Sequence, residues 1–198
     1  MILDFLNQFR KANNSIRKLR LCDNFERIGD PSLKSIEITD YKEDFLMIAP
    51  RDHGEMAYFL PWKEDTGFYI DLPKNTPQTL IFLTSELSGC FVGVQNLDDV
   101  YRIRHYNFQT MDIDGKDFCR YNFAGHLVHW LAPQRGNVSE ELKKVNAPHE
   151  VYDNYSGHSP ILFWGEFVDN DWQFYYQTTD NTIHRFLVIL NSATLLQI

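Results

Sequence analysis

Short runs of large apolar residues, interrupted by Asp, Gly or Pro, dominate this sequence and constrain its fold more than any other feature. Between residues 32 and 72 they are SIEI, FLMIA, MAYFLPW and GFYIDL, and further runs follow at 79–84, 90–95 and 100–107. Three more are PILFWGEFV, DWQFYYQTT and TIHRFLVIL. Such runs are typical of β-strands, and the Asp169-Asn170 pair between two of them suits a tight hairpin turn. We therefore expect a core of mostly antiparallel strands.

Two segments have helical patterns instead. Apolar residues from Ile2 to Leu19 recur at roughly helical spacing, which predicts an amphipathic N-terminal helix. Within residues 116–146, Asn137 and Glu140 form a capping pattern for a short helix, whereas GHLVHWL suits either a helix or a strand. Together with the strands, these segments predict an α+β (mixed α/β) fold, in which a β-sandwich core is flanked by helices. One domain over residues 1–198 is expected from the length.

The charge balance disfavours several classes of partner. The chain has 27 Asp and Glu against 19 Lys and Arg, a net charge of -8. Nucleic acids and anionic membranes attract proteins with excess positive charge, so we expect neither as a partner. The longest apolar runs, such as 186–190, are far shorter than the roughly 20 residues that span a bilayer. Asp4 interrupts the opening apolar stretch, so no Sec-type signal peptide is expected.

Cysteine and histidine spacing predicts neither a disulfide scaffold nor a metal site. The cysteines are Cys22, Cys90 and Cys119, an odd number whose spacing matches no zinc motif, and a reducing compartment is expected. His126 and His129 have no evident third ligand. The stretch MDIDGKD resembles a calcium loop only briefly, because the acidic twelfth ligand is missing. No metal and no cofactor are therefore expected.

The segment from Cys90 to His105 can bring a thiol and an imidazole together. If NLDD forms the turn of an antiparallel hairpin, Cys90 lies directly opposite His105, and opposed Cβ atoms are about 4.5 to 5.5 Å apart. Both residues would then end an apolar face, with Arg102 and Arg104 on the other face. An imidazole beside a thiol can take its proton and lower the thiol pKa, which makes the sulfur a nucleophile.

Residues just before this thiol complete the candidate site. Gly89, with Ser88, permits a tight turn that exposes the Cys90 backbone N-H as an oxyanion donor. Thr84 would lie beside Cys90 if residues 79–84 paired with the cysteine strand, and its hydroxyl could then orient the site. The candidate catalytic residues are thus Cys90, His105 and Thr84. From the residues alone, a buried structural cysteine beside a satisfied histidine stays an open alternative.

The sequence Leu87-Ser88-Gly89-Cys90, with Thr84 before it and His105 after it, resembles the LSGC-type site of the toxin glutamine deamidases. That group includes the catalytic domain of the cytotoxic necrotizing factors and the Burkholderia lethal factor family. The latter is the more similar, because LPWK at 60–63, IFLTSELSGC and WQFYYQTT occur in the same order. The resemblance spans most of the chain. It departs in a longer hairpin between the cysteine and the histidine and in the region 108–157, where little matches.

The resemblance implies a two-layer β-sandwich with helices and a thiol-dependent hydrolysis of a glutamine side-chain amide in a host protein. For the lethal factor family that host protein is the translation-initiation RNA helicase, and for the necrotizing factors it is a Rho-type GTPase. We therefore expect a monomeric toxin, made in the bacterial cytoplasm and acting in the host cytoplasm. A thiol transglutaminase or peptidase, and a non-catalytic β-sandwich binding module, stay open as alternatives.

Overall fold

Every element in the described part of the chain is a β-strand. The computed structural model describes residues 18–21, 30–42, 45–62, 67–87, 90–106, 128–133, 149–155, 162–178 and 182–188. The strands are β1 (Lys18–Leu21), β2 (Ser32–Lys42), β3 (Phe45–Pro50), β4 (Glu55–Leu60), β5 (Gly67–Pro73), β6 (Ile81–Thr84), β7 (Phe91–Asn96), β8 (Val100–Tyr106), β9 (Val128–Pro133), β10 (His149–Tyr155), β11 (Leu162–Val168), β12 (Asp171–Gln177) and β13 (Ile183–Phe186).

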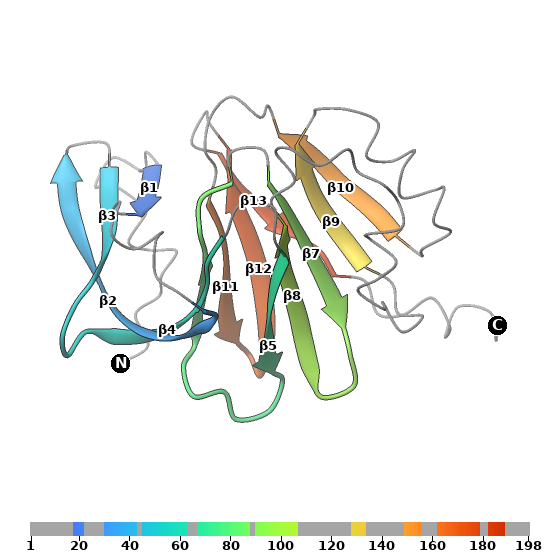
Figure 1. Cartoon of the computed structure of the whole chain (residues 1–198), viewed down its shortest axis with the longest axis horizontal. Helices are drawn as coiled ribbons and strands as arrows, with labels where there is room; N and C mark the ends of the chain where they lie inside the picture. Colours follow the sequence, from blue (N-terminus) through green and yellow to red (C-terminus); the bar gives the residue numbers. More distant parts are fainter. Residues whose placement is uncertain are drawn as a thin grey trace.

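The strands form two sheets. The larger sheet has eight strands in the order β1-β3-β2-β4-β6-β11-β12-β13, and the smaller has five in the order β10-β9-β7-β8-β5. Figure 1 shows β1, β2 and β3 on the left, β11 and β12 in the middle, and β9 and β10 on the right. Most neighbours are antiparallel, but β1 and β3, β4 and β6, and β9 and β10 run parallel.

The main hydrophobic core lies between the two sheets. It combines residues of β4, β6, β11 and β12 with residues of β5, β7 and β8. Aromatic rings make up much of it, and Phe163 and Phe174 stack with ring centroids 5.9 Å apart. A second cluster, which includes Phe59, Leu83 and Trp164, lies on the opposite face of the larger sheet. Strands β4, β6 and β11 are therefore apolar on both faces, which explains their continuous rather than alternating apolar runs.

Polar groups join the two sheets at the end where β7 turns into β8. The hydroxyl of Tyr101 on β8 donates to Asp171 on β12 across 3.2 Å, and Nε1 of Trp172 donates to the Pro73 carbonyl across 2.9 Å. Burial, followed by the charge and the hydrogen bond of Asp171, raises the pKa of Tyr101, so the hydroxyl keeps its proton. Nζ of Lys74 donates to the Leu97 carbonyl and so holds the turn as well.

Replacing Gly165 by alanine should destabilise the fold. A Cβ atom at this position on β11 would lie 3.0 Å from Cδ1 and Cε1 of Phe174 and 3.4 Å from Cδ1 of Phe82. Since the surrounding core is packed, we expect Gly165→Ala to lower the free energy of unfolding by about 1 to 3 kcal/mol, measured by urea denaturation. The exposed Val168→Ala on the same strand is the control and should change it by about 0.5 kcal/mol or less. An unchanged midpoint for Gly165→Ala would contradict this packing.

The strand predictions are confirmed, but the predicted fold class is wrong. The described residues form a β-rich fold of two sheets, not an α+β fold with flanking helices. Leu19 lies in β1, and the latter part of GHLVHWL lies in β9, because a short apolar run fits a helix or a strand equally well. The rest of the predicted N-terminal helix, residues 2–17, and the predicted helix after Asn137 lie outside the described residues.

Two further predictions can be compared with the fold. The hairpin turn at Asp169-Asn170 is confirmed, since Val168 pairs with Asp171 and the two turn residues have φ angles of 54° and 63°. Within the described ranges there is no helix with the length and apolar character needed to cross a membrane.

Candidate active site

Cys90 and His105 lie on the same face of the smaller sheet, but not directly opposite each other. The register pairs Val92 with His105, and the hairpin is closed by a 3.0 Å hydrogen bond from the Leu97 amide to the Val100 carbonyl. The predicted pairing of Cys90 with His105 is therefore wrong by two residues. A shift of two residues preserves the alternation of faces, so both residues still face the inter-sheet core as diagonal neighbours.

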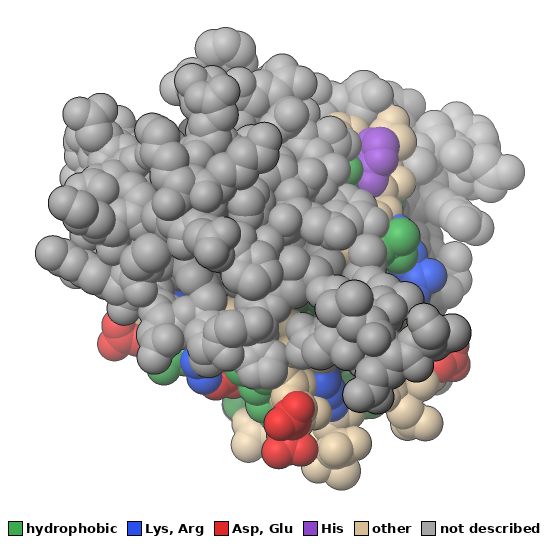
Figure 2. All heavy atoms as spheres, turned by 90° about the vertical axis from the view of Figure 1, so that its right-hand side faces the viewer, with side chains coloured by type: hydrophobic (Ala, Val, Ile, Leu, Met, Phe, Trp, Pro, Cys, Tyr) green, Lys and Arg blue, Asp and Glu red, His purple; other side chains and the backbone are tan. Residues whose placement is uncertain are grey.

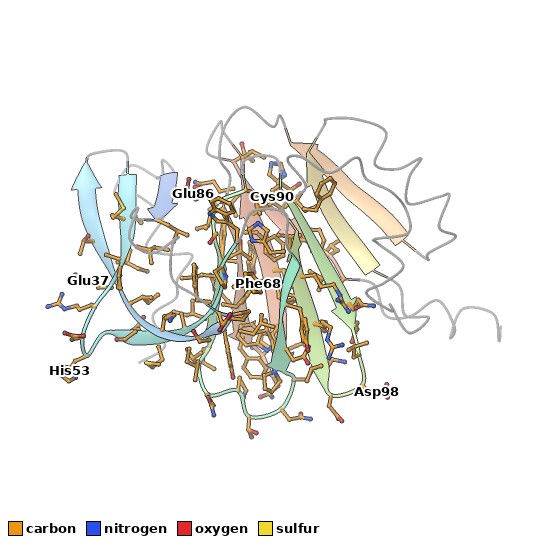
Figure 3. All side chains as sticks on the ribbon, in the orientation of Figure 1. Glu37, His53, Phe68, Glu86, Cys90 and Asp98 are labelled. Carbon is orange, nitrogen blue, oxygen red and sulfur yellow. The ribbon has the colours of Figure 1, made fainter. Side chains whose placement is uncertain are left out.

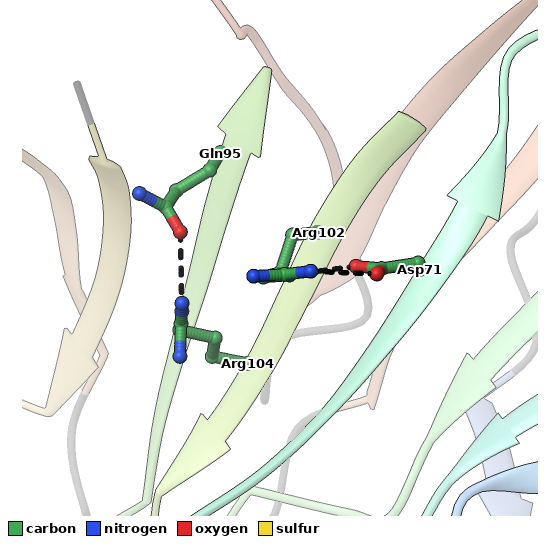
Figure 4. A network of polar contacts seen from close by, with 4 residues as sticks. All are labelled: Asp71, Gln95, Arg102 and Arg104. Carbon is green, nitrogen blue, oxygen red and sulfur yellow. Dashed lines mark hydrogen bonds and ion pairs between the residues drawn. The ribbon is translucent and has the colours of Figure 1, made fainter. Parts of the chain in front are cut away.

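Side-chain contacts on the outer face of the smaller sheet hold β5, β7 and β8 in register around His105. As predicted, Arg102 and Arg104 lie on this face (Figure 4). Arg102 makes two hydrogen bonds of 2.7 Å to Asp71 on β5, which raise its pKa, and Nε of Arg104 donates to Gln95 on β7 across 3.2 Å. The Arg102 guanidinium also lies 4.6 Å from the ring centre of Tyr69. These contacts connect β8 to both of its neighbours.

His105 is a deeply buried imidazole. Its exposed fraction is 1%, and it lies between Val92 on β7 and Phe68 on β5 in the two registers. Neither ring nitrogen makes a hydrogen bond of good geometry to any described residue. Burial lowers the pKa of His105 to about 3, although the nearby Leu60 carbonyl acts in the opposite direction. The imidazole is therefore neutral near pH 7.

Cys90 is also enclosed by the core. It carries a thiol rather than a disulfide, and only 3% of its surface is exposed. It belongs to the inter-sheet cluster together with Leu60 and Leu87. A neutral imidazole can accept the thiol proton, but an imidazolium would be needed to stabilise the thiolate electrostatically. The charged pair requires more polar surroundings than this closed arrangement provides.

Thr84 reaches this region from the other sheet. The predicted pairing of residues 79–84 with the cysteine strand is wrong, because β6 lies between β4 and β11. Thr84 ends β6 and pairs with Leu60, and its hydroxyl lies 2.8 Å from the Ser85 carbonyl and 3.3 Å from the Phe163 carbonyl. The Leu60 carbonyl accepts the Ser85 amide across 3.0 Å and also faces His105. Leu60 is thus the structural link between Thr84 and His105.

These residues gather at one end of the molecule, opposite the joined end of the sheets. Cys90 and Glu86 lie near the top of Figure 3, and Asp98 in the β7–β8 turn lies near the bottom. A carboxylate oxygen of Glu86 accepts the Leu21 amide across 3.1 Å, which ties the segment before Cys90 to β1. The residues with candidate chemistry therefore come from β6, from the position just before β7, and from β8.

Several predicted site residues cannot be placed. Ser88 and Gly89 lie outside the described residues, so their role at the oxyanion stays a prediction. Cys22, Cys119 and His126 lie outside them as well. Where the chain is described, no cluster of three or more His, Cys, Asp or Glu side chains is placed to hold a metal ion.

Sequence reasoning missed two groups beside His105. One is the Leu60 carbonyl, a backbone group that no residue pattern reveals. The other is Phe68, which pairs with His105 on the side away from Val92. The run GFYIDL predicted the strand that carries Phe68, but only its pairing with β8 identifies the neighbour.

Comparisons with known proteins find a likeness only to solved structures, and the one described here is distant. No family model matches the sequence, and no curated protein matches it. The C-terminal domain of CNFy from Yersinia pseudotuberculosis is similar to this chain with 10% sequence identity and a TM-score of 0.30. The likeness covers 68% of this chain and 60% of that one. It does not extend to the Burkholderia lethal factor family, and at this score it establishes neither a shared fold nor the role of any residue.

Proposed function

We propose that this protein is a protein glutamine deamidase of the toxin type, with Cys90 as nucleophile, His105 as proton carrier and Thr84 as a positioning residue. One observation carries the proposal: His105 is buried beside the thiol-bearing segment, and beyond the approach of the Leu60 carbonyl its ring nitrogens make no hydrogen bond of good geometry to a described residue. Buried polar groups with a purely structural role are nearly always hydrogen-bonded. A neutral imidazole on the same face as Cys90 is available to accept its proton.

The proposed reaction has two halves. His105 takes the proton of Cys90, and the sulfur attacks the carboxamide carbon of a substrate glutamine. The backbone amides of Ser88, Gly89 and Cys90 stabilise the oxyanion, and the imidazolium returns its proton to the departing ammonia, which leaves a thioester. His105, neutral again, then activates water, which releases glutamate and the thiol.

The lowered pKa of His105 favours one step of this sequence in particular. An imidazolium that is unstable in its surroundings is a strong acid, so it readily protonates the leaving amine. The same burial makes the imidazole a weaker base toward the thiol. Thr84 contributes indirectly, because it fixes the end of β6 and, through Ser85, the Leu60 carbonyl that faces His105.

The proposed substrate is a host protein, with no nucleic acid or membrane component. The resemblance to the lethal factor family at LPWK, IFLTSELSGC and WQFYYQTT supports the translation-initiation RNA helicase as the first target. The LSGC-type site shared with the necrotizing factors supports a Rho-type GTPase as the second. A net charge of -8 favours encounter with a target that presents a basic surface. On the face shown in Figure 2, acidic and basic side chains of the described residues are interspersed.

The proposal is tested by mapping modified glutamines in a eukaryotic lysate treated with the purified protein. We expect one glutamine, in the initiation helicase, to convert to glutamate, with translation declining in parallel. Conversion in a Rho-type GTPase instead would reassign the target and keep the activity. A primary amine added to the lysate identifies transamidation if it becomes attached to glutamine, and new peptide termini identify proteolysis. A lysate with unchanged glutamines would contradict the proposal.

A non-catalytic binding module is the second candidate function. The burial of both Cys90 and His105 favours it, because a closed core can hold a small cysteine for packing alone. In that case no glutamine in the treated lysate is converted to glutamate, and a Cys90→Ala variant binds its partner as the wild type does. Glutamine conversion that depends on Cys90 excludes this candidate.

A further inference from the structure

The closed state of the site raises the question of how a substrate reaches it. A carboxamide carbon must come within about 3 to 3.5 Å of the attacking sulfur. With exposed fractions of 3% for Cys90 and 1% for His105, no side chain from another protein can do this in the present arrangement. If the proposed function holds, part of the wall around the site must therefore move, and the following inference rests on that function.

Among the described strands, the fewest lie between His105 and an edge of the smaller sheet on the β5 side. Strand β7 lies between β8 and β9, so access past Val92 is blocked by a further strand. On its other side, β8 pairs with β5, which is the edge strand of the described sheet. An edge strand is bonded to one neighbour only, and it separates from its sheet more readily than an interior strand.

Phe68 is the side chain that closes this route. It lies on β5 directly opposite His105 and therefore points into the space between the sheets. It is partly buried and packs against the cluster that contains Cys90 and Val92. Figure 3 shows Phe68 on the smaller sheet, below the end of the molecule where Cys90 lies. Its partial burial means that part of the residue is already accessible to solvent.

We propose that Phe68 gates the Cys90–His105 site, and that a glutamine-bearing segment of the substrate displaces its ring to reach the thiol. The incoming side chain would then occupy the place of the ring beside His105. The substrate class that fits is an exposed, extended segment able to lie along the edge strand β5. In the free protein, access to the thiol is limited by the displacement of Phe68.

Alkylation of Cys90 by iodoacetamide tests the gate without any substrate. The rate at Cys90 is followed by peptide mass spectrometry at pH 7, so that Cys22 and Cys119 are scored separately. Since removing the ring leaves the route past β5 open, we expect Phe68→Ala to raise the rate about tenfold or more, and Phe68→Leu to raise it much less. The matched control is Phe167→Ala, another partly buried phenylalanine on the same core cluster, but placed beside Trp172. Phe167→Ala should change the rate by about twofold at most.

Each outcome decides the proposal. Equal acceleration in Phe68→Ala and Phe167→Ala would indicate general loosening and overturn it, as would no acceleration in either. Wild-type labelling as fast as in urea would show an open site and overturn it too. If Phe68→Ala does not fold, hydrogen exchange in the wild type decides, because a gate requires the β5 amides to exchange faster than those of β7. If Phe68→Ala accelerates alkylation of Cys90 but the protein converts no glutamine in a treated lysate, the gate is retained and only the proposed function is rejected.

Discussion

Replacing Cys90 by serine should lower glutamine conversion in the target by about a thousandfold or more. The hydroxyl is nearly the same size as the thiol, so the core around Leu60 and Leu87 is little disturbed. It is a far weaker acid than the thiol, however, and His105, whose pKa is about 3, cannot remove its proton effectively. The measurement is the ratio of glutamate to glutamine in the target peptide against time.

Two controls separate chemistry from folding in this experiment. Cys22→Ser and Cys119→Ser should retain the wild-type rate, because neither residue has a part in the proposed reaction. Near-ultraviolet circular dichroism of Cys90→Ser should match that of the wild type. A Cys90→Ser protein that still converts glutamine at a comparable rate would remove the sulfur from the mechanism.

Acid should destabilise the protein through His105. The pKa of this residue is about 3 in the folded state, against an ordinary value near 6.5. Between these two pH values the unfolded chain binds a proton that the folded chain does not. The stability contributed by the neutral imidazole is therefore complete above pH 6.5 and is lost as the pH falls toward 3, at up to about 1.4 kcal/mol per pH unit.

Urea unfolding at several pH values from 7 to 4 measures this effect. Carboxylates also titrate in this range, so the quantity of interest is the difference in slope between the wild type and His105→Gln. We expect the slope of unfolding free energy against pH to be smaller in His105→Gln by up to about 1.4 kcal/mol per pH unit, which corresponds to the uptake of one proton. His53→Gln, at an exposed surface turn, is the control and should keep the wild-type slope. Identical slopes for all three proteins would show that His105 is not buried as a neutral group.

The strands could be predicted because their sequences satisfy local and tertiary requirements at once. FVGVQ and FYYQ combine strand-forming residues with burial on one or both faces, and Asp169-Asn170 provides the positive φ angles that a two-residue hairpin needs. The face assignment of Arg102 and Arg104 also followed from alternation alone. Side chains alternate between the two faces of a strand with a period of two residues, so a face assignment stays correct when the pairing register is wrong by two residues.

The candidate site was harder to predict because it depends on pairing rather than on pattern. The hairpin turns at Asp98-Asp99, so its centre lies one residue further along the chain than the centre of the predicted NLDD turn, and this moves the register by two residues. Thr84 could not be placed because β6 crosses to the other sheet after β5, whereas strands that are neighbours in sequence most often pair. The burial of His105 depends on both sheets, and no residue spacing reveals it.

The hydrogen bonds of Tyr101 and Trp172 have a mechanical consequence for the whole sandwich. They join the two sheets at the end where β7 turns into β8, whereas Cys90 lies just before the other end of β7. We expect thermal motion that separates the two sheets to be smallest at these bonds and to grow with distance from them, toward the end of the molecule where Cys90 lies.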